Sequence, residues 1–136
     1  MKVYVSSRFK NKELVKSFML KLLTMRHRTM EPMEFVQTWQ DEDASKGSQA
    51  IDDHLYAKQV AHRDLTELDR AEVVIILTEG CELVPGGMHF EAGYAYAQGK
   101  RIIVIGPRVH VFYHMGTIES YESIGQFLAS NFESTL

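Results

Sequence analysis

Glu91 is the residue in this sequence best suited to covalent chemistry. It follows a glycine-rich turn, Val84 to Gly87, and stands early in a segment of helical composition. Glycines let a ligand approach the backbone closely, and the positive end of a helix dipole favours the ionised carboxylate that a nucleophile needs. We therefore predict that Glu91 is catalytic. The alternative is a glutamate that only stabilises the start of its helix.

The residues just before Glu91 are expected to contact a substrate. Gly86 and Gly87 leave room for a ligand beside the backbone, and Met88 follows them at the start of the helix. His89 either touches the substrate or is a solvent-facing helix residue.

Other candidate residues lie elsewhere in the chain. Ser6, Ser7 and Arg8 follow a short β-prone run and offer hydroxyls, backbone N–H groups and a guanidinium, which suit a phosphate or a sugar, although Ser is also an ordinary helix cap. Trp39 could stack on a nucleobase, although a single aromatic residue is more often part of the core. Asp64 could supply a second carboxylate only if its helix began or unwound there; by itself it is more typical of a solvated helix residue.

The histidines and the cysteine do not form a metal site. His110 and His114 are four residues apart in a segment without a helical pattern, and His54 and His62 are eight apart without a carboxylate partner at helical spacing. Cys81 is the only cysteine, so no intramolecular disulfide can form, and we expect a structural role for it. The sequence predicts no metal and no cofactor.

The apolar runs predict parallel strands. Val73 to Leu77 and Ile102 to Ile105 are unbroken and rich in β-branched residues, as is typical of central strands covered on both faces. Val3 to Val5 predicts another strand, and apolar residues at positions 14, 15, 18, 19, 22 and 23 predict the helix after it. A further strand is expected within about 28 to 38, where Pro32 favours an edge position.

The remaining segments predict helices and a loop. Apolar spacing indicates a long amphipathic helix from about Ile51 to Arg70, with two aspartates near its amino end. The polar stretch at 40 to 50 is expected to be a mobile loop or lid. A last short strand around Ile118 and a helix from about Ser123 to Ala129 complete the prediction.

Strands that alternate with helices indicate a doubly wound α/β fold. We expect a flavodoxin- or Rossmann-like single domain over residues 1–136, with a mostly parallel sheet and helices on both faces. In such folds ligands bind beyond the carboxyl ends of the strands. The turns that carry Ser6, Trp39 and the glycines before Glu91 all follow predicted strands.

Composition narrows the classes of partner. The net charge of −3 argues against binding to a nucleic-acid polymer, because such surfaces are strongly basic. No apolar window is long enough for a membrane span, and the amino terminus does not resemble a signal peptide. With one cysteine in 136 residues, a reducing cytoplasm is the expected location.

The segments Asp64 to Ile75 and Gly86 to Lys100 resemble the nucleoside 2-deoxyribosyltransferase family. The second segment contains the pattern Gly-x-x-x-Glu-x-Gly-x-Ala-x-x-x-Gly-Lys. The resemblance implies that Glu91 attacks the anomeric carbon of a nucleoside or nucleotide and forms a glycosyl-enzyme intermediate. It also implies that Asp64 positions the substrate.

The same resemblance implies that the sugar is transferred to another base and that the protein is a homo-oligomer. Tyr113, His114 and the carboxyl-terminal segment are candidates for completing a neighbouring subunit's site. Transferases of the family often carry an acidic residue about six positions before the nucleophile, where this chain has Pro85.

Three alternatives stand beside transfer. Related nucleoside-monophosphate N-glycosidases hold a 5′-phosphate with the loop after the first strand, where this chain has Ser6, Ser7 and Arg8, so hydrolysis of a nucleotide is the closest alternative. A Toll/interleukin-receptor-like NAD-cleaving domain shares the order of elements and a catalytic glutamate. A non-catalytic module that binds nucleotides or proteins could use the same fold.

Overall fold

A parallel sheet of five strands forms the centre of the molecule, in the order β2-β1-β3-β4-β5. The computed structural model describes residues 1–25, 32–42, 53–81, 86–130 and 132. The strands are β1 (Lys2–Ser6), β2 (Glu34–Phe35), β3 (Val73–Leu77), β4 (Arg101–Ile105) and β5 (Glu119–Tyr121). Every pairing between neighbouring strands is parallel, which confirms the predicted flavodoxin-like α/β fold.

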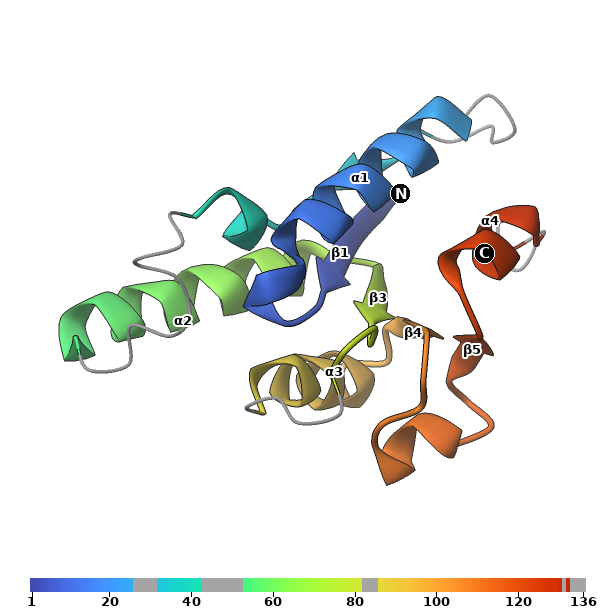
Figure 1. Ribbon diagram of the computed structural model, residues 1–136. Coiled ribbons are helices and arrows are strands. Elements are labelled where there is room, and N and C mark those ends of the chain that lie inside the picture. Colours follow the sequence, from blue (N-terminus) through green and yellow to red (C-terminus); the bar gives the residue numbers. More distant parts are fainter. Residues whose placement is uncertain (26–31, 43–52, 82–85, 131, 133–136) are drawn as a thin grey trace.

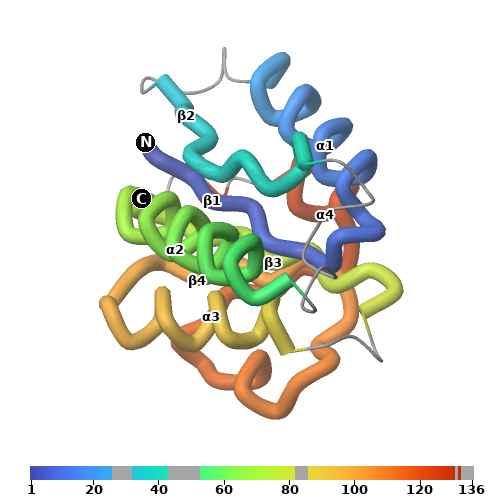
Figure 2. Tube along the Cα trace, turned by 90° about the vertical axis from the view of Figure 1, so that its left-hand side faces the viewer, coloured from blue at the N-terminus to red at the C-terminus, as the bar shows by residue number. Residues whose placement is uncertain are grey.

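Helices cover both faces of this sheet (Figure 1). They are α1 (Lys12–Met25), α2 (His54–Arg70), α3 (Gly87–Ala97) and α4 (Ile124–Ala129), with short 3-10 turns η1 (Phe9–Asn11), η3 (Trp39–Asp41) and η4 (Val111–His114). Figure 2 shows α1 and α4 on one face and α2 and α3 on the other. Because Glu91 belongs to α3, it lies on the face of the sheet that α2 and α3 cover.

The two apolar runs form the predicted central strands. All residues of β3 are buried, and only Arg101 of β4 is partly exposed. Phe18 of α1 and Phe127 of α4 pack together above one face, with ring centroids 5.9 Å apart. Such continuous burial of β-branched side chains is what a sheet covered on both faces requires.

Element boundaries differ from the predictions in two places. The helix expected from Ile51 begins at His54, because the Asp53 side chain accepts a hydrogen bond from the Tyr56 N–H at 3.0 Å and caps it. The expected second strand is reduced to the two residues of β2, at the edge of the sheet as Pro32 predicted.

Two other expectations concern loops and the end of the chain. The loop predicted at 40 to 50 begins inside η3, and its residues from 43 on lie outside the described part. The last strand and helix were predicted correctly as β5 and α4, and the Ser123 hydroxyl caps α4 by accepting a hydrogen bond from the Gln126 N–H at 3.0 Å.

The Gly-Lys pair at the end of the recognised pattern has a structural role. Gly99 adopts a φ of +76° just after α3, a conformation that favours glycine. Lys100 Nζ donates to the carbonyl oxygens of Leu68, Asp69 and Ala71 at 3.0, 2.8 and 2.6 Å. These carbonyls belong to the carboxyl end of α2, so Lys100 satisfies groups that the helix itself leaves without partners.

Candidate active site

Glu91 lies in the second turn of α3 and is held by two hydroxyls of β1. The Tyr4 hydroxyl donates to Oε2 of Glu91, and the Ser6 hydroxyl donates to Oε1 at 3.1 Å. Tyr4 and Ser6 are two residues apart in a strand, so their side chains project to the same face of the sheet. Because Ser6 is the last residue of β1, the carboxylate sits at the carboxyl end of the strand.

This position is the switch point of the sheet. From β1 the chain crosses to β2 on one side, and β3 pairs with β1 on the other, with Ser6 opposite Ile76. Ligands of doubly wound folds bind where the strand order reverses in this way. Glu91 therefore stands at the place where the fold favours a ligand site.

Burial dominates the electrostatic environment of Glu91. Burial raises the pKa of its carboxyl from 4.5 to about 7, the hydrogen bond from Tyr4 opposes this rise, and the charge of Asp64 adds to it. Removal from water therefore outweighs the interactions that favour the ionised form, and the net shift is upward. A carboxyl with a pKa near neutrality at a strand end is characteristic of a functional site.

Tyr4 is a dedicated hydrogen-bond donor. Its side chain is completely buried. Burial, followed by the negative charge of Glu91, raises the pKa of the Tyr4 phenol far above its ordinary value of 10.0. The hydroxyl therefore keeps its proton at all physiological pH values and holds one oxygen of Glu91 in place.

Asp64 lies in the middle of α2, and its charge acts on Glu91 and Tyr4. The helix neither begins nor unwinds at Asp64, so the condition expected for its participation is not met. Only 22% of the side chain is exposed, so it is also not a solvated helix residue. Burial raises the pKa of Asp64, and its own charge raises the pKa values of Tyr4 and Glu91, which places the three groups in one electrostatic unit.

The loop after β1 is tied down by its own polar side chains. The Ser7 hydroxyl donates to the carbonyl oxygen of Leu77 at 2.7 Å and accepts from Asn11 Nδ2 at 2.9 Å. Arg8 Nε donates to Asn11 Oδ1 at 3.1 Å. The guanidinium of Arg8 lies against Gly80, where an added Cβ would come within 2.4 Å of Nη2. Ser7 therefore supports the loop, whereas Arg8 presents a partly buried cation at the strand ends.

Two of the predicted binding residues belong to the core. Trp39 is 7% exposed, and its indole Nε1–H donates to the carbonyl oxygen of Val5 at 2.8 Å. Met88 is 4% exposed. The prediction that Trp39 stacks on a nucleobase is therefore corrected, because its ring is enclosed and its donor is used within the fold. Met88, the second residue of α3, likewise belongs to the hydrophobic core, so its predicted contact with substrate is also corrected.

The glycines before α3 stand in the open. Gly86 caps the helix and Gly87 is its first residue; both are exposed, and apart from neighbouring residues and the backbone of the helix itself, no described atom lies within 4 Å of a Cβ placed on either. This room agrees with the predicted approach of a ligand to the backbone. Pro85, which occupies the position of the acidic residue found in transferases, lies outside the described residues.

His89 contacts Tyr113, one of the candidates for completing a neighbouring subunit's site. Its Nδ1 lies 2.7 Å from the hydroxyl of Tyr113, which is buried in the same chain, and its ring centroid is 5.1 Å from that of His110. Burial, then the charge of His110, lowers the pKa of His89. Tyr113 is thus an internal partner of His89, while His114 is exposed on η4.

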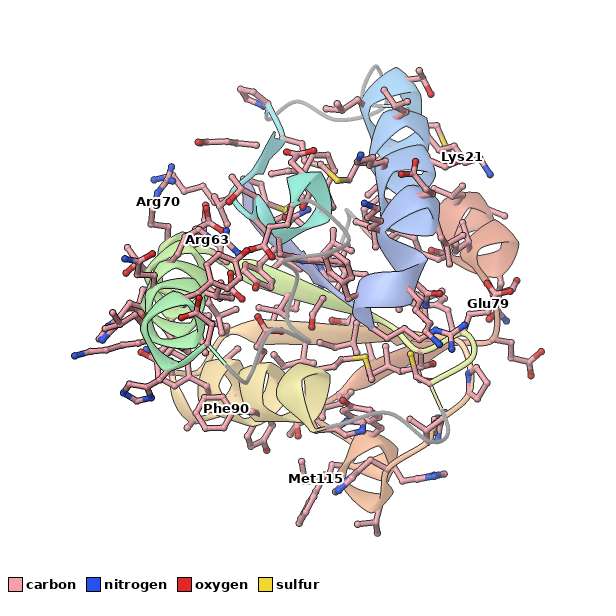
Figure 3. The ribbon with its side chains drawn as sticks, turned by 60° about the vertical axis from the view of Figure 1, so that its left-hand side comes forward. Lys21, Arg63, Arg70, Glu79, Phe90 and Met115 are labelled. Atoms are coloured by element: carbon pink, nitrogen blue, oxygen red, sulfur yellow. The ribbon has the colours of Figure 1, made fainter. Side chains whose placement is uncertain are left out.

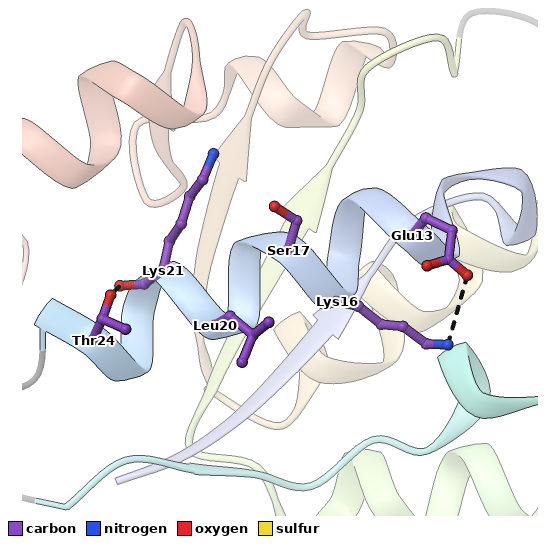
Figure 4. A pocket seen from close by; sticks show the side chains of 6 residues that line it. All are labelled: Glu13, Lys16, Ser17, Leu20, Lys21 and Thr24. Carbon is purple, nitrogen blue, oxygen red and sulfur yellow. Dashed lines mark hydrogen bonds and ion pairs between the residues drawn. The ribbon is translucent and has the colours of Figure 1, made fainter.

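Two surface hollows in the described part of the chain are lined by residues other than Glu91. One hollow of about 530 Å³ runs along α1 and is lined by residues such as Ser17, Leu20 and Lys21 (Figure 4). Another of about 390 Å³ lies at the ends of β3 and β4, beside α4. Neither hollow is lined by Tyr4 or Ser6, the residues that form hydrogen bonds with Glu91. The candidate site is therefore identified by these hydrogen bonds and not by a cavity.

The described residues contain neither a metal-binding cluster nor a membrane-spanning helix. Among them, no group of three or more histidine, cysteine, aspartate or glutamate side chains is arranged to hold a metal ion. In the same residues, no helix has both the length and the apolar character needed to cross a membrane.

A buried carboxylate at the switch point of a flavodoxin-like sheet, bound by strand hydroxyls, defines an enzyme-like site. The family model for nucleoside 2-deoxyribosyltransferase matches residues 3–124. The chain belongs to this family, whose members act on N-glycosidic bonds of nucleosides and nucleotides.

Comparison with solved structures agrees on the fold. The chain resembles the CMP N-glycosidase BcmB of Clostridium botulinum, with a TM-score of 0.60 and 19% sequence identity over 100% of both chains. No match was found among the curated proteins.

Proposed function

We propose that the protein cleaves the N-glycosidic bond of a (deoxy)nucleoside or nucleotide, with Glu91 as nucleophile, and transfers the sugar to another base. The observation that supports this proposal is the binding of both Glu91 oxygens by Tyr4 and Ser6 at the carboxyl end of β1. These contacts fix the carboxylate in one orientation, which is what attack on a single carbon atom requires.

The proposed reaction has two steps. In the first, an oxygen of ionised Glu91 bonds to the anomeric carbon while the bond from that carbon to the base breaks, and the base leaves with the electron pair and gains a proton. The transition state resembles an oxocarbenium ion, which a nearby carboxylate stabilises. In the second, a ring nitrogen of an acceptor base bonds to the same carbon while the bond from that carbon to Glu91 breaks, and the acceptor gives up its N–H proton, which balances the proton gained by the first base. Asp64 is proposed to position the substrate in both steps.

A second candidate is hydrolysis of a nucleoside 5′-monophosphate, in which water takes the place of the acceptor base. Its support is the placement of Arg8, whose guanidinium is anchored by Asn11 and lies against Gly80 at the strand ends, close in sequence to Ser6. A guanidinium held in this way suits a phosphate. The CMP N-glycosidase with the same fold carries such an activity in its name.

The test is a chromatographic assay of nucleosides and their 5′-monophosphates, each with and without a free acceptor base. New nucleoside that forms only with acceptor supports transfer, and free base released from monophosphates without acceptor supports hydrolysis. Loss of monophosphate cleavage in Arg8→Met, with nucleoside cleavage retained, would assign the phosphate contact. Cleavage that persists in Glu91→Gln would refute both, and turnover of NAD alone, or binding without turnover, would favour the remaining alternatives.

A further inference from the structure

Arg63 makes an unusual contact with the residue next to it in α2. Its Nε and Nη2 donate to Oδ1 of Asp64 at 3.2 and 2.8 Å. Consecutive residues of a helix project about 100° apart and do not normally face each other. The Arg63 side chain is therefore directed to Asp64 by something other than helix geometry.

That second influence is Glu42, which follows η3. Nη2 of Arg63 also forms an ion pair with Oε1 of Glu42, whose side chain is only 9% exposed. Figure 3 shows Arg63 on the side of α2 that faces this turn. A carboxylate so enclosed needs a cation, because an unpaired buried charge is strongly unfavourable. Arg63 thus bridges two carboxylates from different parts of the chain.

The turn itself is held against α2 at its other end. Glu67, one helical turn after Arg63, accepts hydrogen bonds from the backbone N–H and the hydroxyl of Thr38 at 3.0 and 2.7 Å. Thr38 precedes η3 and Glu42 follows it. Two α2 side chains therefore fix both ends of η3, and Arg63 is the one that also binds Asp64.

The charges around Asp64 are mostly negative. From α2 it is faced by Arg63 and Glu67, from the segment after η3 by Glu42, and the carboxyl of Glu91 on α3 responds to its charge, as does Tyr4 on β1. In the described part of the chain, Arg63 is the cation that forms ion pairs in this group. The hydrogen bond from Arg63 lowers the pKa of Asp64 against the effect of burial.

We propose that Arg63 is a positioning residue, which binds Glu42 and Asp64 at once and thereby orients the Asp64 carboxylate for substrate. This inference rests on the proposed function, because it assigns Asp64 to the substrate. Arg63 engages Oδ1 of Asp64 and leaves Oδ2 for another partner. Removing Arg63 frees both carboxylates to move.

The chain offers a matched control on the same helix. Arg70 also pairs with a glutamate, with Nη2 3.0 Å from Oε1 of Glu34, but both side chains are about half exposed. Exposed ion pairs contribute little. Arg70→Met therefore reports what loss of an α2 arginine does when no site residue depends on it.

The experiment combines kinetics with the pKa of Asp64, measured by carbon-detected NMR in substrate-free protein. We expect Arg63→Met to raise the Asp64 pKa and lower kcat/KM for N-glycoside cleavage about 10- to 100-fold, with partial recovery in Arg63→Lys and no change in Arg70→Met. In an Asp64→Asn background, Arg63→Met should cause little further loss, because the two residues act as one unit.

Three results would overturn the proposal: an unchanged Asp64 pKa in Arg63→Met, independent losses in the double variant, or equal losses in Arg70→Met. If Arg63→Met does not fold, Arg63→Lys carries the same comparisons. The NMR measurement needs no turnover, so it decides the contact between Arg63 and Asp64 even if Glu91→Gln keeps its activity and the proposed function fails.

Discussion

Replacing Glu91 with glutamine should stabilise the folded protein above pH 7 while it removes the activity. The folded protein raises the Glu91 pKa from 4.5 to about 7. Each pKa unit corresponds to about 1.36 kcal/mol, so ionising Glu91 disfavours folding by up to about 3 kcal/mol. Glutamine keeps acceptor and donor atoms for Tyr4 and Ser6 but never ionises.

The sign follows from proton binding. Between pH 4.5 and about 7 the folded state keeps the Glu91 proton that the unfolded state has lost. The folded state then binds more protons, so wild-type stability falls as the pH rises through this window and the penalty is complete above it. The stabilisation by Glu91→Gln should therefore be near zero at pH 4 and reach about 1 to 3 kcal/mol at pH 8.

Urea unfolding of both proteins at pH 4 and pH 8 measures this difference. Glu13→Gln serves as control, because that carboxylate is on the exposed surface of α1. Turnover by Glu91→Gln should be lower by about 10³-fold or more. A stability difference that is the same at both pH values, or a glutamine variant that is the less stable at pH 8, would refute the account of Glu91 burial.

Three more predictions test the surrounding contacts. Tyr4→Phe should raise the Glu91 pKa, since the lost hydrogen bond lowers it, and reduce kcat/KM about tenfold at pH 6. Recovery at alkaline pH should be partial, because one of the two contacts that orient Glu91 is also lost; an unmoved acid limb in the pH profile would contradict this. Gly106→Ala should destabilise by about 2 kcal/mol or more, because φ is +114° and the new Cβ would lie 2.6 Å from Thr78 Oγ1, whereas Gly116→Ala should be nearly neutral in the same melt. Lys100→Met should lower stability by about 1 to 2 kcal/mol through the lost contacts at the end of α2 and leave kcat/KM unchanged.

The sheet could be predicted because its central strands are encoded locally. The runs at Val73 to Leu77 and Ile102 to Ile105 have a composition that satisfies burial on both faces, and they form neighbouring strands. Pro32 correctly indicated an edge, because a residue without an N–H cannot donate to a central ladder. The start of α2 was placed less well, since a cap depends on a single hydrogen bond.

Site residues could be predicted only where neighbouring residues in the same segment indicated their function. Glu91 follows its glycines directly, so the turn pointed to it. Tyr4 was missed because a tyrosine in an apolar run reads as a strand residue, although its spacing of two from Ser6 was a usable signal. Asp64 was judged from its own helix, whereas the charges that surround it depend on how α2 packs against the rest of the molecule, which is a tertiary property. Trp39 was assigned to a ligand because burial cannot be read from a single aromatic residue.

The hydroxyls of Tyr4 and Ser6, which hold Glu91, belong to one of the most protected strands of the sheet. β1 is hydrogen-bonded on both sides, to β2 and to β3, and lies beneath α2 and α3. Backbone in such a position opens only when the whole molecule unfolds, whereas chain ends and surface loops open locally. Local opening of surface segments should therefore leave the hydrogen bonds from Tyr4 and Ser6 to Glu91 intact. The orientation of Glu91 should be lost only when the sheet unfolds.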